Sequence, residues 1–154
     1  MIKVKPLIIS LLIALGTGFL SALFTSGSME IYTGLSKPPL APPSTVFPIV
    51  WTVLFILMGL SSYLVYLSPD PDRGTALKIY AVQLVFNFAW PIAFFNFQAF
   101  LFAFIWIMIL WVLIIYMIKE FMKVNKKAGY LQIPYLLWTT FAAYLNLFIW
   151  LMNR

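Results

Sequence analysis

The chain has 154 residues, of which 64% are hydrophobic and only 9% are charged, with a net charge of +6. A soluble domain carries roughly 25% charged residues, so this composition excludes a water-soluble globule and indicates an integral membrane protein. The sequence contains no Cys and no His, which excludes disulfides, thiol nucleophiles, the usual zinc sites and His-ligated haem. We therefore expect no metal site and no required cofactor.

Long uncharged runs predict an all-α membrane protein, a bundle of five transmembrane helices in a single domain at residues 1–154. A helix needs about 20 residues to cross a bilayer, so the 40-residue run Ile79–Ile118 must hold two helices. Its most polar patch, Asn96-Phe97-Gln98, predicts the turn between them, and Pro91 predicts a kink shortly before that turn. The predicted helices cover residues 6–26, 46–67, 75–95, 99–119 and 130–152.

The first predicted helix follows a short basic segment, as the apolar part of a signal peptide also does. Its apolar stretch Leu7–Phe24 is longer than the usual signal-peptide core of about 7–15 residues, and no clean A-x-A cleavage site follows it. We therefore favour a first membrane helix over a cleaved signal peptide.

A proline-rich loop, predicted at residues 27–45, leads into the second helix. Five of the ten prolines lie between Ser36 and Trp51, namely Pro38, Pro39, Pro42, Pro43 and Pro48. Proline removes backbone donors and disfavours helix at the residue before it, so the segment should be stiff and extended. At the mouth of a helical bundle such a loop is expected to act as a lid.

The basic residues predict the orientation of the bundle in the membrane. Five helices place the N-terminus and two of the loops on one side, with eight Lys and Arg residues, against two on the other side. The positive-inside rule then puts the N-terminus in the cytoplasm and the proline-rich loop outside. Because the basic residues flank the helices, no nucleic-acid partner is expected.

Three predicted helices each carry aromatic and amide or small residues on one face. These residues are Trp51, Phe55, Met58 and Ser62, then Gln83, Asn87 and Trp90, and finally Tyr135, Trp138, Ala142 and Asn146. An amide in hydrocarbon needs a partner, so these faces should point inward. For Gln83 we favour a hydrogen bond between helices, whereas Asn87 fits such a bond and a ligand contact equally well.

The other tryptophans, Trp106, Trp111 and Trp150, lack polar or small neighbours at helical spacing, and we predict that they face lipid or its interface. The inward faces would form an aromatic, uncharged cavity that suits a flat lipophilic ligand. Ion coupling would require a charged group or His within the membrane, which the long uncharged runs do not supply.

Three motifs in this order resemble those of the translocator protein (TspO/MBR) family, also known as tryptophan-rich sensory proteins and peripheral benzodiazepine receptors. They are Tyr32-x2-Leu35-x-Lys37-Pro38-x3-Pro42-Pro43 followed by Phe47-x2-Val50-Trp51-Thr52, then Gln83-Leu84-x2-Asn87-x2-Trp90, and Pro134-Tyr135-x2-Trp138-x2-Phe141-Ala142-x2-Leu145-Asn146. The resemblance spans nearly the whole chain. It implies a five-helix bundle, usually a homodimer in the lipid bilayer, that binds porphyrins and in some members sterols or benzodiazepine-type drugs.

From the resemblance and the inward faces together we predict a ligand site. Its residues are Tyr32, Pro42, Phe47, Trp51, Phe55, Asn87, Trp90, Trp138 and Ala142. The expected function is binding of a porphyrin such as protoporphyrin IX, in porphyrin or stress handling. The resemblance also implies light-dependent protoporphyrin degradation, with Trp51 and Trp138 as the reacting residues. A transporter of porphyrins, sterols or other lipophiles is the remaining alternative.

The sequence departs from the family pattern at two places. Ile31 stands where the family has a tryptophan beside the loop tyrosine. The C-terminal sterol pattern falls at Leu145–Leu151, where both the tyrosine and the basic residue are missing. Sterol recognition through that pattern is therefore not expected.

Overall fold

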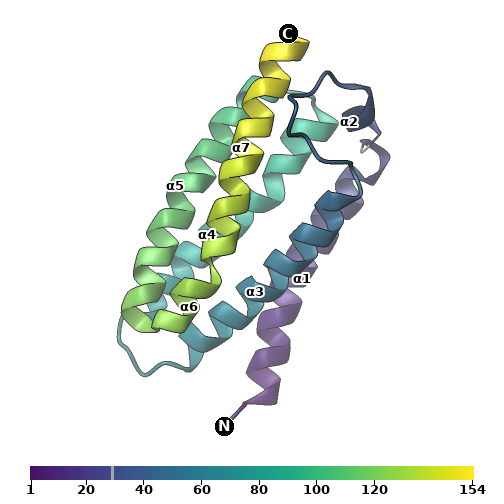
Figure 1. The fold of residues 1–154 in the computed structure, drawn as a ribbon. Coiled ribbons are helices and arrows are strands. Elements are labelled where there is room, and N and C mark those ends of the chain that lie inside the picture. The colour runs from purple at the N-terminus through teal and green to yellow at the C-terminus, as the bar shows by residue number, and fades with distance from the viewer. Residues whose placement is uncertain (29) are drawn as a thin grey trace.

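The computed structural model describes residues 1–28 and 30–154, and these residues form helices and loops without a β-strand (Figure 1). The elements in chain order are α1 (Val4–Thr25), η1 (Ser26–Ser28), α2 (Ile31–Gly34), α3 (Val46–Leu67), α4 (Arg73–Pro91), η2 (Ile92–Asn96), α5 (Phe100–Val124), α6 (Lys126–Leu131) and α7 (Ile133–Asn153). Five segments are long and apolar enough to cross a membrane: Val4–Ser28, Val46–Leu67, Arg73–Asn96, Phe100–Val124 and Lys126–Asn153. The predicted all-α bundle of five transmembrane helices is confirmed.

Pro91 changes the geometry of the third span. Because proline has no N–H to donate to the carbonyl four residues earlier, the helical ladder is interrupted there. The chain continues as a π-helical turn, η2, and the Phe97 N–H bonds to the Ile92 carbonyl at 3.2 Å. Gln98 then adopts a left-handed φ of 49°, which reverses the chain into α5. The turn therefore falls at the polar patch where the sequence predicts it.

The connection between the fourth and fifth spans is almost entirely helical. Asn125 is extended, and its side chain accepts a hydrogen bond from the Ala128 N–H at 3.1 Å, which caps α6. As a result α5 continues to Val124, and the fifth span begins as the short helix α6 before α7. Asparagine at a cap satisfies a free N–H of the first helical turn, which explains a break of a single residue.

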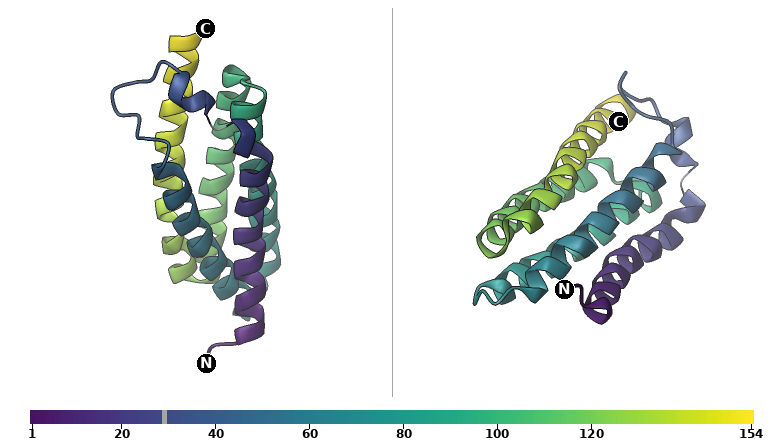
Figure 2. Two further views of the ribbon diagram at one scale, coloured as in Figure 1. Left: turned by 90° about the vertical axis from the view of Figure 1, so that its right-hand side faces the viewer. Right: turned by 60° about the horizontal axis from the view of Figure 1, so that its bottom comes forward.

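Four of the five spans, α1, α3, α4 with η2, and α7, enclose a space at one end of the bundle. The N-terminal half of α1 lies against α3, where Gly59 approaches the backbone of Leu11. From there the two helices separate toward the proline-rich loop (Figure 2). On the other side α5 packs between α4 and α7. The loop and α2 lie over the open end (Figure 1).

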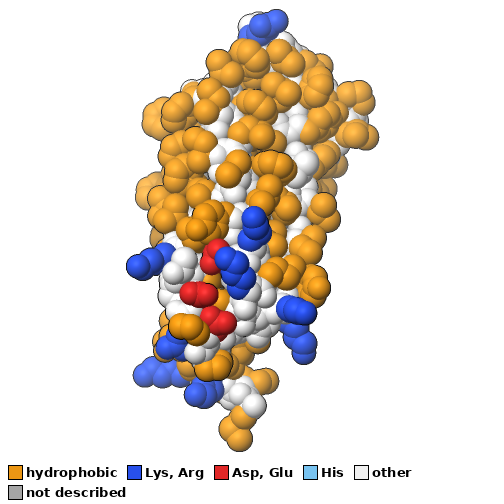
Figure 3. Space-filling model, turned by 90° about the vertical axis from the view of Figure 1, so that its left-hand side faces the viewer, with side chains coloured by type: hydrophobic (Ala, Val, Ile, Leu, Met, Phe, Trp, Pro, Cys, Tyr) orange, Lys and Arg blue, Asp and Glu red, His pale blue; other side chains and the backbone are white. Residues whose placement is uncertain are grey.

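Charged side chains gather at the opposite end of the bundle. Figure 3 shows hydrophobic side chains over most of one face, with Lys, Arg, Asp and Glu near the end that carries the N-terminus. Between Lys123 and Glu120, on the exposed end of α5, an ion pair forms at 3.0 Å. This division, with an apolar girdle and a charged end, is what a bilayer and its aqueous boundary require.

Candidate functional site

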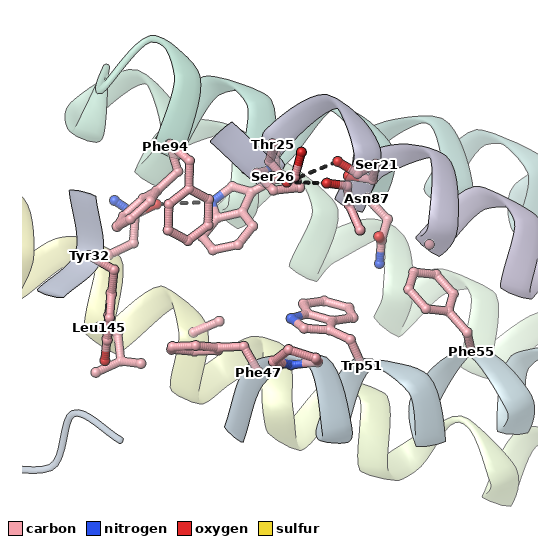
Figure 4. Close-up of a pocket in the computed structure, with 18 of the residues that line it drawn as sticks. Ser21, Thr25, Ser26, Tyr32, Phe47, Trp51, Phe55, Asn87, Phe94 and Leu145 are labelled. Carbon is pink, nitrogen blue, oxygen red and sulfur yellow. Dashed lines mark hydrogen bonds between the residues drawn. The ribbon is translucent and has the colours of Figure 1, made fainter. Parts of the chain in front are cut away.

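A cavity of about 360 Å³ lies at the loop end of the bundle, between the second half of α1, the first half of α3, the end of α4 with η2, and the second half of α7 (Figure 4). Its lining residues are Gly18, Ser21, Ala22, Thr25, Ser26, Tyr32, Phe47, Pro48, Trp51, Phe55, Asn87, Trp90, Pro91, Phe94, Phe95, Ala142, Leu145, Asn146 and Ile149. None of these residues is charged.

Helix α1 makes room for the cavity with small residues. Gly18 lies so close to Phe55 that a Cβ atom there would come within 2.5 Å of two ring carbons. The Ser21 hydroxyl donates to the Phe88 carbonyl at 3.1 Å, and the Thr25 hydroxyl donates to the Ser21 carbonyl at 2.9 Å. Because both hydroxyls are already bonded to backbone, this wall is less polar than its sequence indicates.

Helix α3 supplies an aromatic wall. Phe47, Trp51 and Phe55 recur every four residues and therefore share one face of the helix. The rings of Trp51 and Phe55 are 5.8 Å apart, and Phe47 meets the Tyr32 ring edge-on at 5.0 Å. Figure 4 shows these side chains along one side of the cavity, opposite Asn87 and Phe94.

The amides of α4 form hydrogen bonds to α7. The Asn87 Nδ2 group donates to the Tyr135 hydroxyl at 2.7 Å, and this hydroxyl donates to Gln83 Oε1, also at 2.7 Å. The predicted role of Gln83 between helices is confirmed by this bond. Asn87 makes the interhelical bond as well and also lines the cavity, and its contact with a ligand stays a prediction.

A second pair of hydrogen bonds fixes the indole of Trp90. Its Nε1 donates to Asn146 Oδ1 at 3.0 Å, and the Asn146 amide donates to the Phe100 carbonyl at 2.8 Å. α4, α7 and the start of α5 are therefore tied together beside the cavity. Both polar side chains are buried, so removing either would leave an unpaired group in an apolar interior.

The proline-rich segment is held over the cavity by its own contacts. The buried Tyr32 hydroxyl donates to the Pro42 carbonyl at 2.7 Å, and the Lys37 ammonium donates to the Tyr32 and Leu35 carbonyls at 2.8 and 3.0 Å. Burial raises the pKa of the Tyr32 phenol above its usual value, so the hydroxyl remains a donor at neutral pH. Met29, which is part of the predicted loop, lies outside the described residues.

The same segment is attached to the end of α7. The Ser36 N–H donates to Asn153 Oδ1 at 3.0 Å, while Asn153 Nδ2 donates to the Ser36 carbonyl at 2.8 Å. One side chain thus satisfies both backbone groups of a residue in the loop. This paired contact holds the loop at the C-terminal end of the bundle.

Most of the predicted site residues meet at this cavity. Those that line it are Tyr32, Phe47, Trp51, Phe55, Asn87, Trp90 and Ala142. Pro42 lies outside the lining and accepts the hydrogen bond from Tyr32. Trp138 lies behind the wall, with its ring 5.9 Å from Phe47 and 5.5 Å from Phe141.

Sequence reasoning did not identify the contribution of α1 or the role of two outer tryptophans. Gly18, Ser21 and Thr25 give no aromatic or amide signal, and only their position opposite α3 reveals them. The indoles of Trp106 and Trp111 were predicted to face lipid, but they are half-buried and donate to the Phe86 carbonyl and the Thr140 hydroxyl at 2.9 and 2.8 Å. Each indole is therefore anchored to a neighbouring helix while part of its ring stays exposed, and its contact with lipid stays a prediction.

Among the lining residues Tyr32 is the one titratable side chain. Within residues 1–28 and 30–154, no three or more of Asp, Glu, His and Cys come together as a possible metal site. The cavity therefore offers an uncharged and largely apolar space, with the Asn87 amide and the Trp51 indole in its lining.

A sequence profile described as the TspO/MBR family matches residues 9–151. The chain belongs to the TspO/MBR family. It is 37% identical over 144 residues to the tryptophan-rich protein TspO of Chlorobaculum tepidum. The aligned region covers 92% of this chain and 91% of that relative. It is 33% identical over 152 residues to the TspO protein of Archaeoglobus fulgidus, covering 98% and 99% of the two chains.

The family also contains animal proteins. The chain is 32% identical over 140 residues to the translocator protein of Homo sapiens. The aligned region covers 88% of this chain and 83% of that protein. The resemblance inferred from the three motifs is therefore confirmed. Together with the five apolar spans, family membership identifies a multi-pass integral membrane protein.

Proposed function

We propose that the protein binds a porphyrin, protoporphyrin IX, in the cavity beneath the proline-rich segment, in porphyrin or stress handling. The observation that carries this proposal is the combination of an aromatic wall with an uncharged lining. The planar porphyrin ring gains dispersion and stacking contacts against Phe47 and Trp51. Its two propionate carboxylates would lie outside the uncharged lining, at the mouth of the cavity, where they stay solvated. The cavity volume of about 360 Å³ lies within the range of small-molecule sites, roughly 300–1,000 Å³.

Access from the membrane supports a lipophilic ligand. Ala22, Ser26 and Pro48 line the cavity and are also exposed on the outside of the bundle, so they mark its mouth between α1 and α3. A ligand dissolved in the bilayer would reach this mouth without crossing the aqueous phase. Transport of porphyrins or other lipophiles uses the same cavity, but no charged lining residue is present to couple it to an ion.

A second candidate function is light-dependent breakdown of the bound porphyrin. Dioxygen would be the oxidant, reduced as the ring carbons are oxidised, and an indole beside the ring would exchange an electron with the light-excited porphyrin. The placement of Trp51 in the cavity wall favours this function, and only Phe47 separates Trp138 from the cavity. Neither step requires a His, Cys or buried carboxylate.

Titration and illumination of the same samples separate the two functions. We expect protoporphyrin to bind the purified protein saturably and to quench its tryptophan fluorescence. The Trp51→Phe, Trp138→Phe double variant keeps an aromatic face at both positions. Since an aromatic pair is worth about 0.5–1.5 kcal/mol, its affinity should fall by less than about tenfold. In the same double variant, the rate of any light-driven loss of porphyrin absorbance should fall by a much larger factor than the affinity.

The matched control is Trp150→Phe, which changes an indole outside the cavity lining and should leave both measurements at wild-type values. Absence of saturable binding to the wild-type protein would contradict porphyrin binding altogether. Equal bleaching rates in the wild type and the double variant would contradict a photochemical role for the two indoles while leaving the binding proposal intact.

We also propose that the proline-rich segment faces outward and the α3–α4 connection faces the cytoplasm, because Lys and Arg residues are concentrated at that end of the bundle. The chain has no cysteine, so Thr33→Cys and Thr75→Cys each introduce a single thiol at an exposed position. An impermeant maleimide should label Thr33→Cys in intact cells and Thr75→Cys only after permeabilisation. The reverse pattern would show the opposite orientation.

A further inference from the structure

Three buried residues below the cavity carry polar atoms without a hydrogen-bond partner among the described residues. These atoms are the Tyr80 hydroxyl, which lies beside the Ser62 side chain without a well-formed bond to it, Gln83 Nε2, and both Oε1 and Nε2 of Gln132. Gln83 and Gln132 are 0% exposed and Tyr80 is 5% exposed, so neither bulk water nor lipid headgroups reach them from the surface. An unpaired buried polar group costs about 1–3 kcal/mol, and native structures contain few of them.

The three residues lie within about one helical turn of one another along the bundle. The Tyr135 hydroxyl joins α7 to α4 through its bond to Gln83. Tyr80 precedes Gln83 by three residues and Gln132 precedes Tyr135 by three, which places each roughly one helical turn, about 5 Å, toward the end of the bundle that carries α6. This region is closed by α6, since the Ser61 hydroxyl of α3 donates to the Ala128 carbonyl at 2.7 Å.

The free atoms have the hydrogen-bonding pattern that water requires. The two amide nitrogens offer donors, Gln132 Oε1 offers an acceptor, and the Tyr80 hydroxyl can serve as either. A buried water typically makes about three hydrogen bonds to otherwise unsatisfied groups. No charged residue is part of this set, so an ion is disfavoured.

We propose that ordered water binds between Tyr80, Gln83 and Gln132, in the half of the bundle next to α6. A directed chain of hydrogen bonds links this water to the cavity. Gln83 Oε1 accepts from Tyr135, so Gln83 Nε2 remains to donate to the water. Tyr135 in turn accepts from Asn87 Nδ2, which leaves Asn87 Oδ1 as the acceptor on the cavity side.

This series of hydrogen bonds therefore fixes the orientation of the Asn87 amide, which lines the ligand cavity. Hydrogen bonds in a series polarise one another, so the water strengthens Asn87 as an acceptor toward a ligand donor. This last consequence rests on the proposed function. The water site itself does not, and it is tested on protein without ligand.

Radiolytic hydroxyl-radical footprinting of the ligand-free protein in detergent tests the site directly. Radicals formed from bound water modify neighbouring side chains even when these are buried. We expect Tyr80 to be oxidised, while Met117, which is 0% exposed and intrinsically more reactive, stays unmodified. Gln132→Met removes two of the water's partners and should reduce Tyr80 oxidation several-fold.

Thermal unfolding of the same variant gives an independent measurement. If the cluster is dry, Gln132→Met removes two unpaired atoms and should raise the Tm. If water is bound, the variant loses its hydrogen bonds and should lower the Tm. Oxidation of Tyr80 with a lowered Tm supports the proposal. Protection of Tyr80 as complete as that of Met117, or a raised Tm, overturns it, whether or not the protein binds porphyrin.

Discussion

A leucine at position 18 is expected to remove most of the affinity for protoporphyrin while the bundle stays folded. A Cβ atom on Gly18 would already lie 2.5 Å from two carbons of the Phe55 ring, and both residues line the cavity. The obstacle is the end of a side chain that can rotate away, so the ring and the new isobutyl group would be forced into the cavity space. We expect affinity to fall at least about tenfold, equivalent to 1.4 kcal/mol.

Gly16→Leu is the matched control for this experiment. The two glycines are on the same helix, but a Cβ atom on Gly16 would meet nothing within 4 Å, and Gly16 is not among the lining residues. Fluorescence titration should give wild-type affinity for this control. Wild-type affinity in Gly18→Leu would show that the porphyrin binds elsewhere.

A leucine at position 59 is expected to destabilise the fold itself. A Cβ atom on Gly59 would lie 2.8 Å from Leu11 Cδ2, 3.0 Å from Leu11 Cα and 3.3 Å from the Ser10 carbonyl oxygen. Two of these atoms belong to the α1 backbone, which cannot rotate away, so α1 and α3 would have to separate. Overpacking typically costs about 1–3 kcal/mol and occasionally more.

Thermal unfolding in detergent measures this effect, and Gly16→Leu again serves as the control. Gly59→Leu should lower the Tm by several degrees or prevent accumulation of folded protein, whereas Gly16→Leu should remain near the wild-type Tm. Gly59→Ala should show a smaller loss, because alanine improves helix propensity by up to about 1 kcal/mol over glycine. An unchanged Tm in Gly59→Leu would mean that α1 and α3 are not closely packed there.

The comparison of sequence and structure is clearest at α4. Spacing alone placed Gln83, Asn87 and Trp90 on one inward face, because helical periodicity relates residues within one helix. Spacing did not identify Tyr135 as the partner of both amides, or Asn146 as the partner of the Trp90 indole. Those partners belong to another helix, and the packing angle and register between helices decide which side chains meet.

The two tryptophans of the proposed photochemistry illustrate the same limit. Trp51 and Trp138 both lie on inward faces by their spacing, and Trp51 lines the cavity. Trp138 is one layer behind it, in contact with Phe47. A difference of one layer of side chains depends on how α3 and α7 approach each other, which no pattern within either helix records.

The sequence by itself determined the class of protein, the five spans and the turn at residues 96–98, because hydrocarbon excludes charges over a length that a helix must cross. It also determined that a proline-rich segment precedes the second span, since proline acts on its own backbone. Only the tertiary structure decided that α1 forms a cavity wall. Glycine, serine and alanine carry no pattern of their own, and their smallness matters only where another helix approaches them, as α3 does at Gly18 and α1 does at Gly59.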